Sequence, residues 1–96
     1  PVVKVRDFGE VSHVERDLML IRIHAPAAKR HEVIELAHCF RGRVVDVARD
    51  SLMIELAGPE QKLEAFIDLA RSYGIRQLAR TGVIAMPRGA AGADSD

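Results

Sequence analysis

Tryptophan is absent from this chain of 96 residues, and cysteine and tyrosine each occur once. The single cysteine, Cys39, has no partner for a disulfide within the chain, which favours a reducing compartment such as the cytoplasm. No apolar run approaches the roughly 18–20 residues that span a bilayer, so we expect no membrane association. Fourteen basic side chains balance fourteen acidic ones, whereas proteins that bind nucleic acid usually carry a basic excess. The composition therefore favours one small globular domain with an aliphatic core and no nucleic-acid partner.

What is present is a regular succession of secondary-structure signals. Runs of β-compatible residues predict strands at 18–23, 43–49, 52–57 and 75–86. Apolar residues at i, i+3, i+4 and i+7 predict two helices, the first through Val33, Leu36, Ala37 and Phe40, the second through Leu63, Phe66, Ile67 and Ala70. Gly42 is expected to supply the left-handed residue after the first helix. Gly82 is expected to bend the last strand.

The order of these elements is β-α-β-β-α-β, which predicts an α+β fold of the ferredoxin-like kind. Its four-stranded antiparallel sheet should carry both helices on one face. We expect this sandwich to occupy residues 17–87. The mixed, polar residues before it predict a linker that ends at residue 16. The Gly-, Ala- and Asp-rich residues 88–96 predict a disordered tail.

The face of the sheet away from the helices is the candidate functional surface. If Met19, Ile21 and Ile23 face the helices, alternate residues of the same strand face outward, joined by residues of the hairpin. Apolar side chains mixed with both signs of charge suit a surface that meets protein. A partly solvated sheet is the alternative. The predicted interface consists of Leu18, Leu20, Arg22, His24, Val44, Asp46, Met53 and Glu55.

No pattern predicts catalytic, cofactor-binding or metal-binding residues. The serines lie outside a G-x-S-x-G setting, and no glycine-rich phosphate loop opens a helix. His31 and His38 lie two helical turns, roughly 10 Å, apart, too far to share one metal ion unaided. A site that joins His38 and Cys39 to residues of a second chain stays open. His13 is placed in the linker, and the central strands lack the aromatic residues that stack RNA bases.

Four segments, in order, resemble one known family. The run His13-Val14-Glu15-Arg16-Asp17-Leu18-Met19-Leu20-Ile21-Arg22-Ile23 is similar to the H-V-E-R-E-L-M-L-I-K-V stretch that opens the C-terminal domain of acetolactate synthase small regulatory subunits. The same family is resembled by FRGRVVDV at 40–47, by LAG at 56–58 with KLEAF at 62–66, and by GI at 74–75 with ARTGV at 79–83. The resemblance covers about residues 1–89, although MPRG at 86–89 stands where the family often has a Leu-Ser-Arg-Gly-like end.

This resemblance implies a regulatory, non-catalytic partner of the thiamine-diphosphate-dependent large subunit in branched-chain amino acid biosynthesis. Small subunits activate the catalytic subunit and confer feedback inhibition, usually by valine. Residues 1–7 resemble the last strand of the ACT domain that precedes this domain in the family, so residues 1–16 are expected to be its end and a linker. The valine site belongs to that ACT domain, so no valine-contacting residue is transferred, and no cofactor is expected in this chain.

Two matters stay open at this stage. The outer sheet face could dock a second copy of the chain, in a homodimer or larger assembly, or the complex with the catalytic large subunit. The alternative function is a stand-alone ferredoxin-like dimerisation domain that senses a small molecule or a metal.

Overall fold

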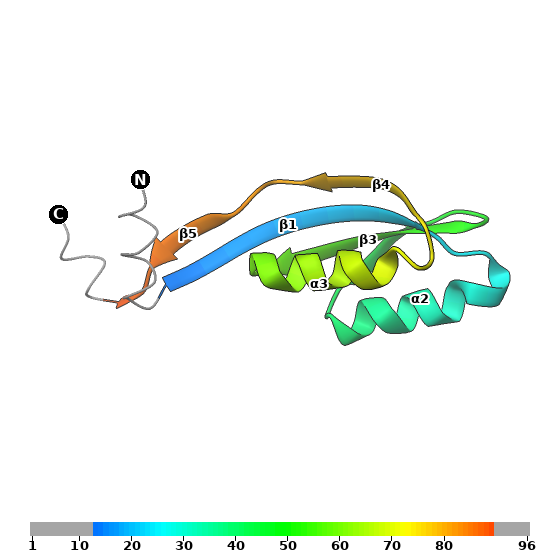
Figure 1. Cartoon of the computed structure of the whole chain (residues 1–96), viewed down its shortest axis with the longest axis horizontal. Coiled ribbons are helices and arrows are strands. Elements are labelled where there is room, and N and C mark those ends of the chain that lie inside the picture. Colours follow the sequence, from blue (N-terminus) through cyan, green and yellow to red (C-terminus); the bar gives the residue numbers. More distant parts are fainter. Residues whose placement is uncertain (1–12, 90–96) are drawn as a thin grey trace.

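The computed structural model of the protein describes residues 13–89, which form two helices and five strands (Figure 1). All strand pairs are antiparallel, and the sheet order is β2-β3-β1-β4, with β5 also paired to β1. Both helices lie on one side of the sheet, which confirms the ferredoxin-like α+β prediction. The elements are β1 His13–His24, α2 Ala27–Cys39, β2 Arg43–Val47, β3 Ser51–Gly58, α3 Glu60–Ala70, β4 Ile75–Arg80 and β5 Ile84–Pro87.

The core lies between the helices and the two central strands. Met19, Ile21 and Ile23 of β1 are fully buried, as alternation along a strand requires when one face is covered. The apolar residues predicted to form one stripe on each helix face this core, and two of them, Leu36 and Phe40, are only partly buried at its edge. The rings of Phe40 and Phe66 meet edge to face, with centroids 5.2 Å apart, a favourable aromatic geometry. The other buried apolar residues are Ala25, Val33, Ala37, Leu52, Ile54, Leu56, Leu63, Ile67 and Ala70.

The end of α2 corrects one prediction about glycine. The left-handed residue is Arg41, with φ 61°, rather than Gly42. Its N–H donates to His38 O at 2.9 Å, and the N–H of Gly42 donates to Ala37 O at 2.8 Å, which together make a Schellman end. Gly42 instead lies where a side chain has little room, because a Cβ there would lie 3.1 Å from Cγ2 of Ile54 and 3.3 Å from the carbonyl oxygen of Glu55.

Strand β1 is longer than the sequence predicted. It begins at His13, so placing the linker as far as residue 16 is wrong for residues 13–16, and His13 belongs to a strand. The mostly polar run His13–Arg16 concealed the strand because these residues pair with β5, where no helix provides an apolar layer. Residues 1–7, which resemble the last strand of an ACT domain, the rest of the predicted linker and residues 90–96 of the predicted tail lie outside the described residues.

The last predicted strand is interrupted, as the glycine in it suggested. Strands β4 and β5 both pair with β1, and residues 81–83 between them contain Gly82 at φ 90°. Strand β5 and residues 13–16 of β1 form a two-stranded ribbon that extends beyond α3 (Figure 1). We call this ribbon the arm. The position of Gly82 as the bend is confirmed.

Tyr73, which follows α3, links the two helices and allows a simple titration test. Its hydroxyl donates a hydrogen bond to Oε1 of Glu32 on α2 at 3.0 Å. This bond, with desolvation and the charge of Glu32, raises the pKa of the phenol above 10.0. Because the pKa is raised in the folded state, the bond stabilises the fold below the unfolded pKa and is lost as pH rises through the folded value.

We expect Glu32→Gln to move the tyrosinate midpoint back toward about 10. Tyr73 is the one tyrosine and tryptophan is absent, so absorbance reports this group alone. Glu35→Gln, also on α2, serves as the control and should leave the midpoint in place. Equal midpoints in all three proteins would contradict the bond, provided circular dichroism shows that the fold persists at the titration pH.

Candidate functional site: the open face of the sheet

The face of the sheet without helices is formed by alternate residues of β1 and by the residues opposite them. We call it the open face. Leu18 and Leu20 are 40% and 42% exposed there, next to core residues that are fully buried. Glu55 lies opposite Leu20, and Met53 lies opposite Arg22. Directly opposite residues of an antiparallel pair point to the same face, so these side chains share one surface, and Gln77 and Ala79 of β4 extend it.

Seven of the eight predicted interface residues lie on the open face, and Val44 does not. Val44 lies opposite Ile54, a core residue, and packs against the core. The register shifts between Val44 and Asp46, so a β-bulge inserts one residue and breaks strict alternation. Asp46 therefore faces outward with Met53, while Val44 faces the helices. Placing Val44 on the open face was wrong.

The charges of the open face pair with one another. Nη2 of Arg22 lies 2.6 Å from a carboxylate oxygen of Asp46, and Nη1 donates to the Ser51 hydroxyl at 2.8 Å. Arg43 lies 3.9 Å from Glu55. With these charges matched internally, the apolar side chains form the part of the face that gains most from being covered. A shallow hollow of ≈ 270 Å³ lies among them, lined in part by Leu20, Arg22, Met53 and Gln77.

His24, at the end of the open face, contacts the charged residues of the neighbouring loops. Its Nδ1 is hydrogen-bonded to Nη2 of Arg76, which lies 3.7 Å from Asp50. These groups form a charged rim beside the apolar strip. A polar rim around an apolar centre is the usual anatomy of a protein contact surface.

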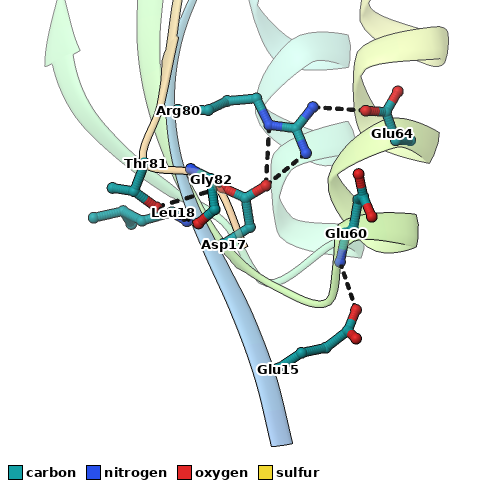
Figure 2. A network of polar contacts seen from close by, with 8 residues as sticks. All are labelled: Glu15, Asp17, Leu18, Glu60, Glu64, Arg80, Thr81 and Gly82. Atoms are coloured by element: carbon teal, nitrogen blue, oxygen red, sulfur yellow. Dashed lines mark hydrogen bonds and ion pairs between the residues drawn. The ribbon is translucent and has the colours of Figure 1, made fainter. Parts of the chain in front are cut away.

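On the helix side, a buried carboxylate fixes the break between β4 and β5 (Figure 2). The side chain of Asp17 is 1% exposed. One of its oxygens accepts hydrogen bonds from Nη2 and Nε of Arg80 at 2.6 and 3.1 Å, and the other accepts from the Gly82 N–H at 3.2 Å. Arg80 also donates to Glu64 on α3 at 2.6 Å. Hydrogen bonds to Glu64 and Asp17 raise the pKa of the Arg80 guanidinium, so the cation is permanent.

The arm is also tied to α3 at its base. The N–H of Glu60, the first residue of α3, donates to Oε1 of Glu15 at 3.4 Å (Figure 2). The N-cap residue of α3 is Pro59, whose side chain makes no capping hydrogen bond. The Glu15 carboxylate takes that place, and a negative charge at a helix N-terminus is favourable. The other oxygen of Glu15 lies 3.2 Å from Nε2 of His13. The sequence prediction missed this contact and that of Asp17, although Glu15 and Asp17 continue the alternation of Met19 and Ile21 on the helix side.

The other histidines do not form a site in the described part of the chain. His31 lies 4.0 Å from Glu35 on the exposed side of α2, and Cys39 is exposed. Within residues 13–89, no three His, Cys, Asp or Glu side chains are grouped so that they could hold a metal ion. The described helices are all too short or too polar to cross a membrane.

The topology defines a ferredoxin-like domain, and the sheet face without helices is partly apolar and carries ion pairs. The family model for the small subunit of acetolactate synthase matches residues 16–89, and the chain belongs to that family. It corresponds to the C-terminal domain of the small subunit, so the resemblance found in the sequence is confirmed.

Relatives from distant organisms agree. The chain is 59% identical to the probable acetolactate synthase small subunit of Archaeoglobus fulgidus over 91% of its own length and 54% of the relative. The small subunit of Aquifex aeolicus is 46% identical, over 90% and 45%. The crystal structure of the small subunit from Thermotoga maritima matches with a TM-score of 0.76 and 38% identity, over 83% and 48%. The chain therefore spans about half the length of these relatives.

Proposed function

We propose that this domain is part of a regulatory, non-catalytic subunit that binds the catalytic large subunit of acetolactate synthase. In this role it supports activation and valine feedback inhibition of branched-chain amino acid biosynthesis, and it acts in the cytoplasm. Membership of the small-subunit family is the observation that carries the proposal. Thiamine diphosphate then stays with the catalytic subunit. No observation on the described residues favours the sensor alternative.

The open face is the surface that we propose for contact with protein. Its apolar strip is exposed, while its charges are matched within the chain, so covering it removes apolar area from water and leaves no ion unpaired. The opposite face cannot serve, because α2 and α3 cover it. In the proposed mechanism, an effector bound elsewhere in the subunit changes how this rigid domain sits on its partner through a difference in affinity between two arrangements.

Leu20→Glu should weaken the contact at least tenfold, about 1.4 kcal/mol. The new carboxylate would lie in the middle of the strip and opposite Glu55, where like charges repel. Titration of the catalytic subunit with the chain, read as stimulated activity and as co-sedimentation, measures contact with that partner. Sedimentation of the chain alone measures contact with a second copy, so the assay that responds identifies the occupant of the open face.

Leu69→Glu is the matched control, because Leu69 is an apolar residue of similar exposure on α3. It should leave both assays unchanged. If Leu20→Glu also leaves both unchanged while thermal melting shows a folded protein, the open face is not a protein contact. If the wild-type chain fails to bind or stimulate the catalytic subunit under any condition, the regulatory role itself is wrong.

A further inference from the structure

The hollow on the open face lies where three strands present their outward side chains. Met53 of β3 and Gln77 of β4 both lie opposite Arg22 of β1, and Ala79 lies opposite Leu20. These five residues and Leu78 line a volume of ≈ 270 Å³. Ala79 has the smallest side chain of the five, and a larger one at that position would occupy part of the space. We call this feature the open-face hollow.

Arg22 supplies the hollow with a planar group in a fixed position. Its Nη2 lies 2.6 Å from a carboxylate oxygen of Asp46, and its Nη1 donates to the Ser51 hydroxyl at 2.8 Å. The side chain is 18% exposed, so it is already ordered within the chain. A guanidinium plane stacks on aromatic rings and is attracted by their π faces. Because Arg22 is held beforehand, little side-chain entropy would be lost when a ring is placed against it.

The other side chains of the open-face hollow suit the same kind of ligand. The thioether of Met53 makes favourable contacts with aromatic rings, and Leu20 and Ala79 add apolar surface. The amide of Gln77 can pair with the hydroxyl of a tyrosine or the indole N–H of a tryptophan. Hot spots of protein interfaces are enriched in Trp, Tyr and Arg, and they tend to pair across the interface. The lining therefore favours an aromatic side chain over an aliphatic one.

The aromatic side chains within residues 13–89 are all used on the helix side of the sheet. Phe66 is fully buried, and Phe40 packs against the core and meets Phe66 edge to face. The hydroxyl of Tyr73 donates to Glu32 on α2. The sequence has no tryptophan, and its third phenylalanine, Phe8, lies outside the described residues. A second copy of the described domain thus has no aromatic side chain to offer, which favours a different protein as its source.

We propose that the open-face hollow receives an aromatic side chain of the catalytic large subunit, whose ring stacks on Arg22 and contacts Met53. This inference rests on the proposed regulatory function and identifies the central contact of its interface. Arg22 keeps Asp46 as its partner, so no ion is left unpaired when the ring excludes water. The attraction between a cation and a ring also becomes stronger once both are desolvated.

The three methionine methyl groups provide a direct test, because each lies in a different place. Met53 lines the open-face hollow, Met19 is fully buried in the core, and Met86 lies on the arm. The full chain, protonated only at its methionine methyls, is mixed with a catalytic subunit that is protonated only at its aromatic side chains. We expect nuclear Overhauser contacts from these aromatic protons to the Met53 methyl and none to Met19 or Met86.

Ala79→Leu tests the hollow without a change of charge. Leucine would fill space that the ring needs, so binding to the catalytic subunit should weaken at least roughly tenfold. Ala65→Leu, at an exposed position of α3, is the matched control and should bind like wild type. Arg22→Lys keeps the positive charge and loses the plane, so it should weaken binding roughly three- to thirtyfold. Co-sedimentation and stimulated activity measure these changes, and thermal melting checks the fold.

Several outcomes would overturn the proposal. An active complex without aromatic contacts to the Met53 methyl, or equal binding by wild type and Ala79→Leu, would reject it and leave the regulatory role intact. A Met53 resonance that moves when the free chain is diluted would assign the hollow to a second copy. One that moves in Phe8→Leu would assign it to the chain itself, and either result rejects the catalytic subunit as the occupant. If the chain neither binds nor stimulates that subunit, the regulatory role fails and this inference fails with it.

Discussion

Asp17→Ala is expected to lower the free energy of unfolding by about 3 kcal/mol. The carboxylate is almost completely buried and accepts hydrogen bonds from the Arg80 guanidinium and the Gly82 N–H. Its removal leaves a largely buried cation with Glu64 as its remaining acid and leaves the Gly82 amide without its acceptor. Breaking a buried pair in this way usually costs about 3–5 kcal/mol. We expect the low end, because the Arg80 side chain is 21% exposed and Glu64 stays in place.

Equilibrium unfolding in urea measures this change, and Asp68→Ala is its matched control. Asp68 lies 3.5 Å from Arg71 on the exposed side of α3, and such surface pairs contribute about 0–1 kcal/mol. Asp17→Asn separates charge from shape, since the amide keeps the volume of the carboxylate. A loss below about 1 kcal/mol in Asp17→Ala would mean that the break between β4 and β5 does not depend on this side chain. Faster amide exchange across β5 is expected in the same variant, because the base of the arm is then released.

The parts of the fold that were predictable depend on local periodicity. Leu18–Ile23 is a β-compatible run in which alternate residues are buried. In α3 the buried residues form a stripe with a period of 3.6 residues, whereas α2 buries only Val33 and Ala37 fully. Such patterns are visible over a few residues, because burial repeats with the geometry of the element itself. Together with the order of elements, they were sufficient for the ferredoxin-like topology and for most of the open face.

What was missed depends on contacts between distant parts of the chain. The bulge that turns Val44 inward is set by pairing with β3 and leaves no local signal. The strand character of residues 13–16 depends on pairing with β5, about 70 residues later in the chain. Asp17 lies on the core side of the alternation, but its role becomes visible only when Arg80, 63 positions away, is placed beside it. A charged residue at a predicted core position was the available signal for this ion pair.

The two faces of the sheet are linked by the same strand. The buried residues of β1 face the helices, and its exposed residues lie on the open face. A partner bound to the open face would therefore contact a strand whose other side is packed in the core. The arm continues this strand outward, and its polar ties to α3 lie on the helix side. A domain arranged in this way passes a change in its position to its partners as a single body, which suits the proposed regulatory role.

Phe66 is the largest fully buried side chain of the described residues, and Phe66→Ala should lower the free energy of unfolding by about 3–5 kcal/mol. The ring is completely buried, faces the sheet from α3 and meets Phe40 of the α2 end edge to face. Alanine would remove apolar contacts to both layers and leave a cavity that the strands cannot close. Leu69→Ala, on the exposed side of the same helix, should cost under about 1 kcal/mol. Urea unfolding of both variants checks the difference, and equal losses would mean that α3 does not hold the sheet through this ring.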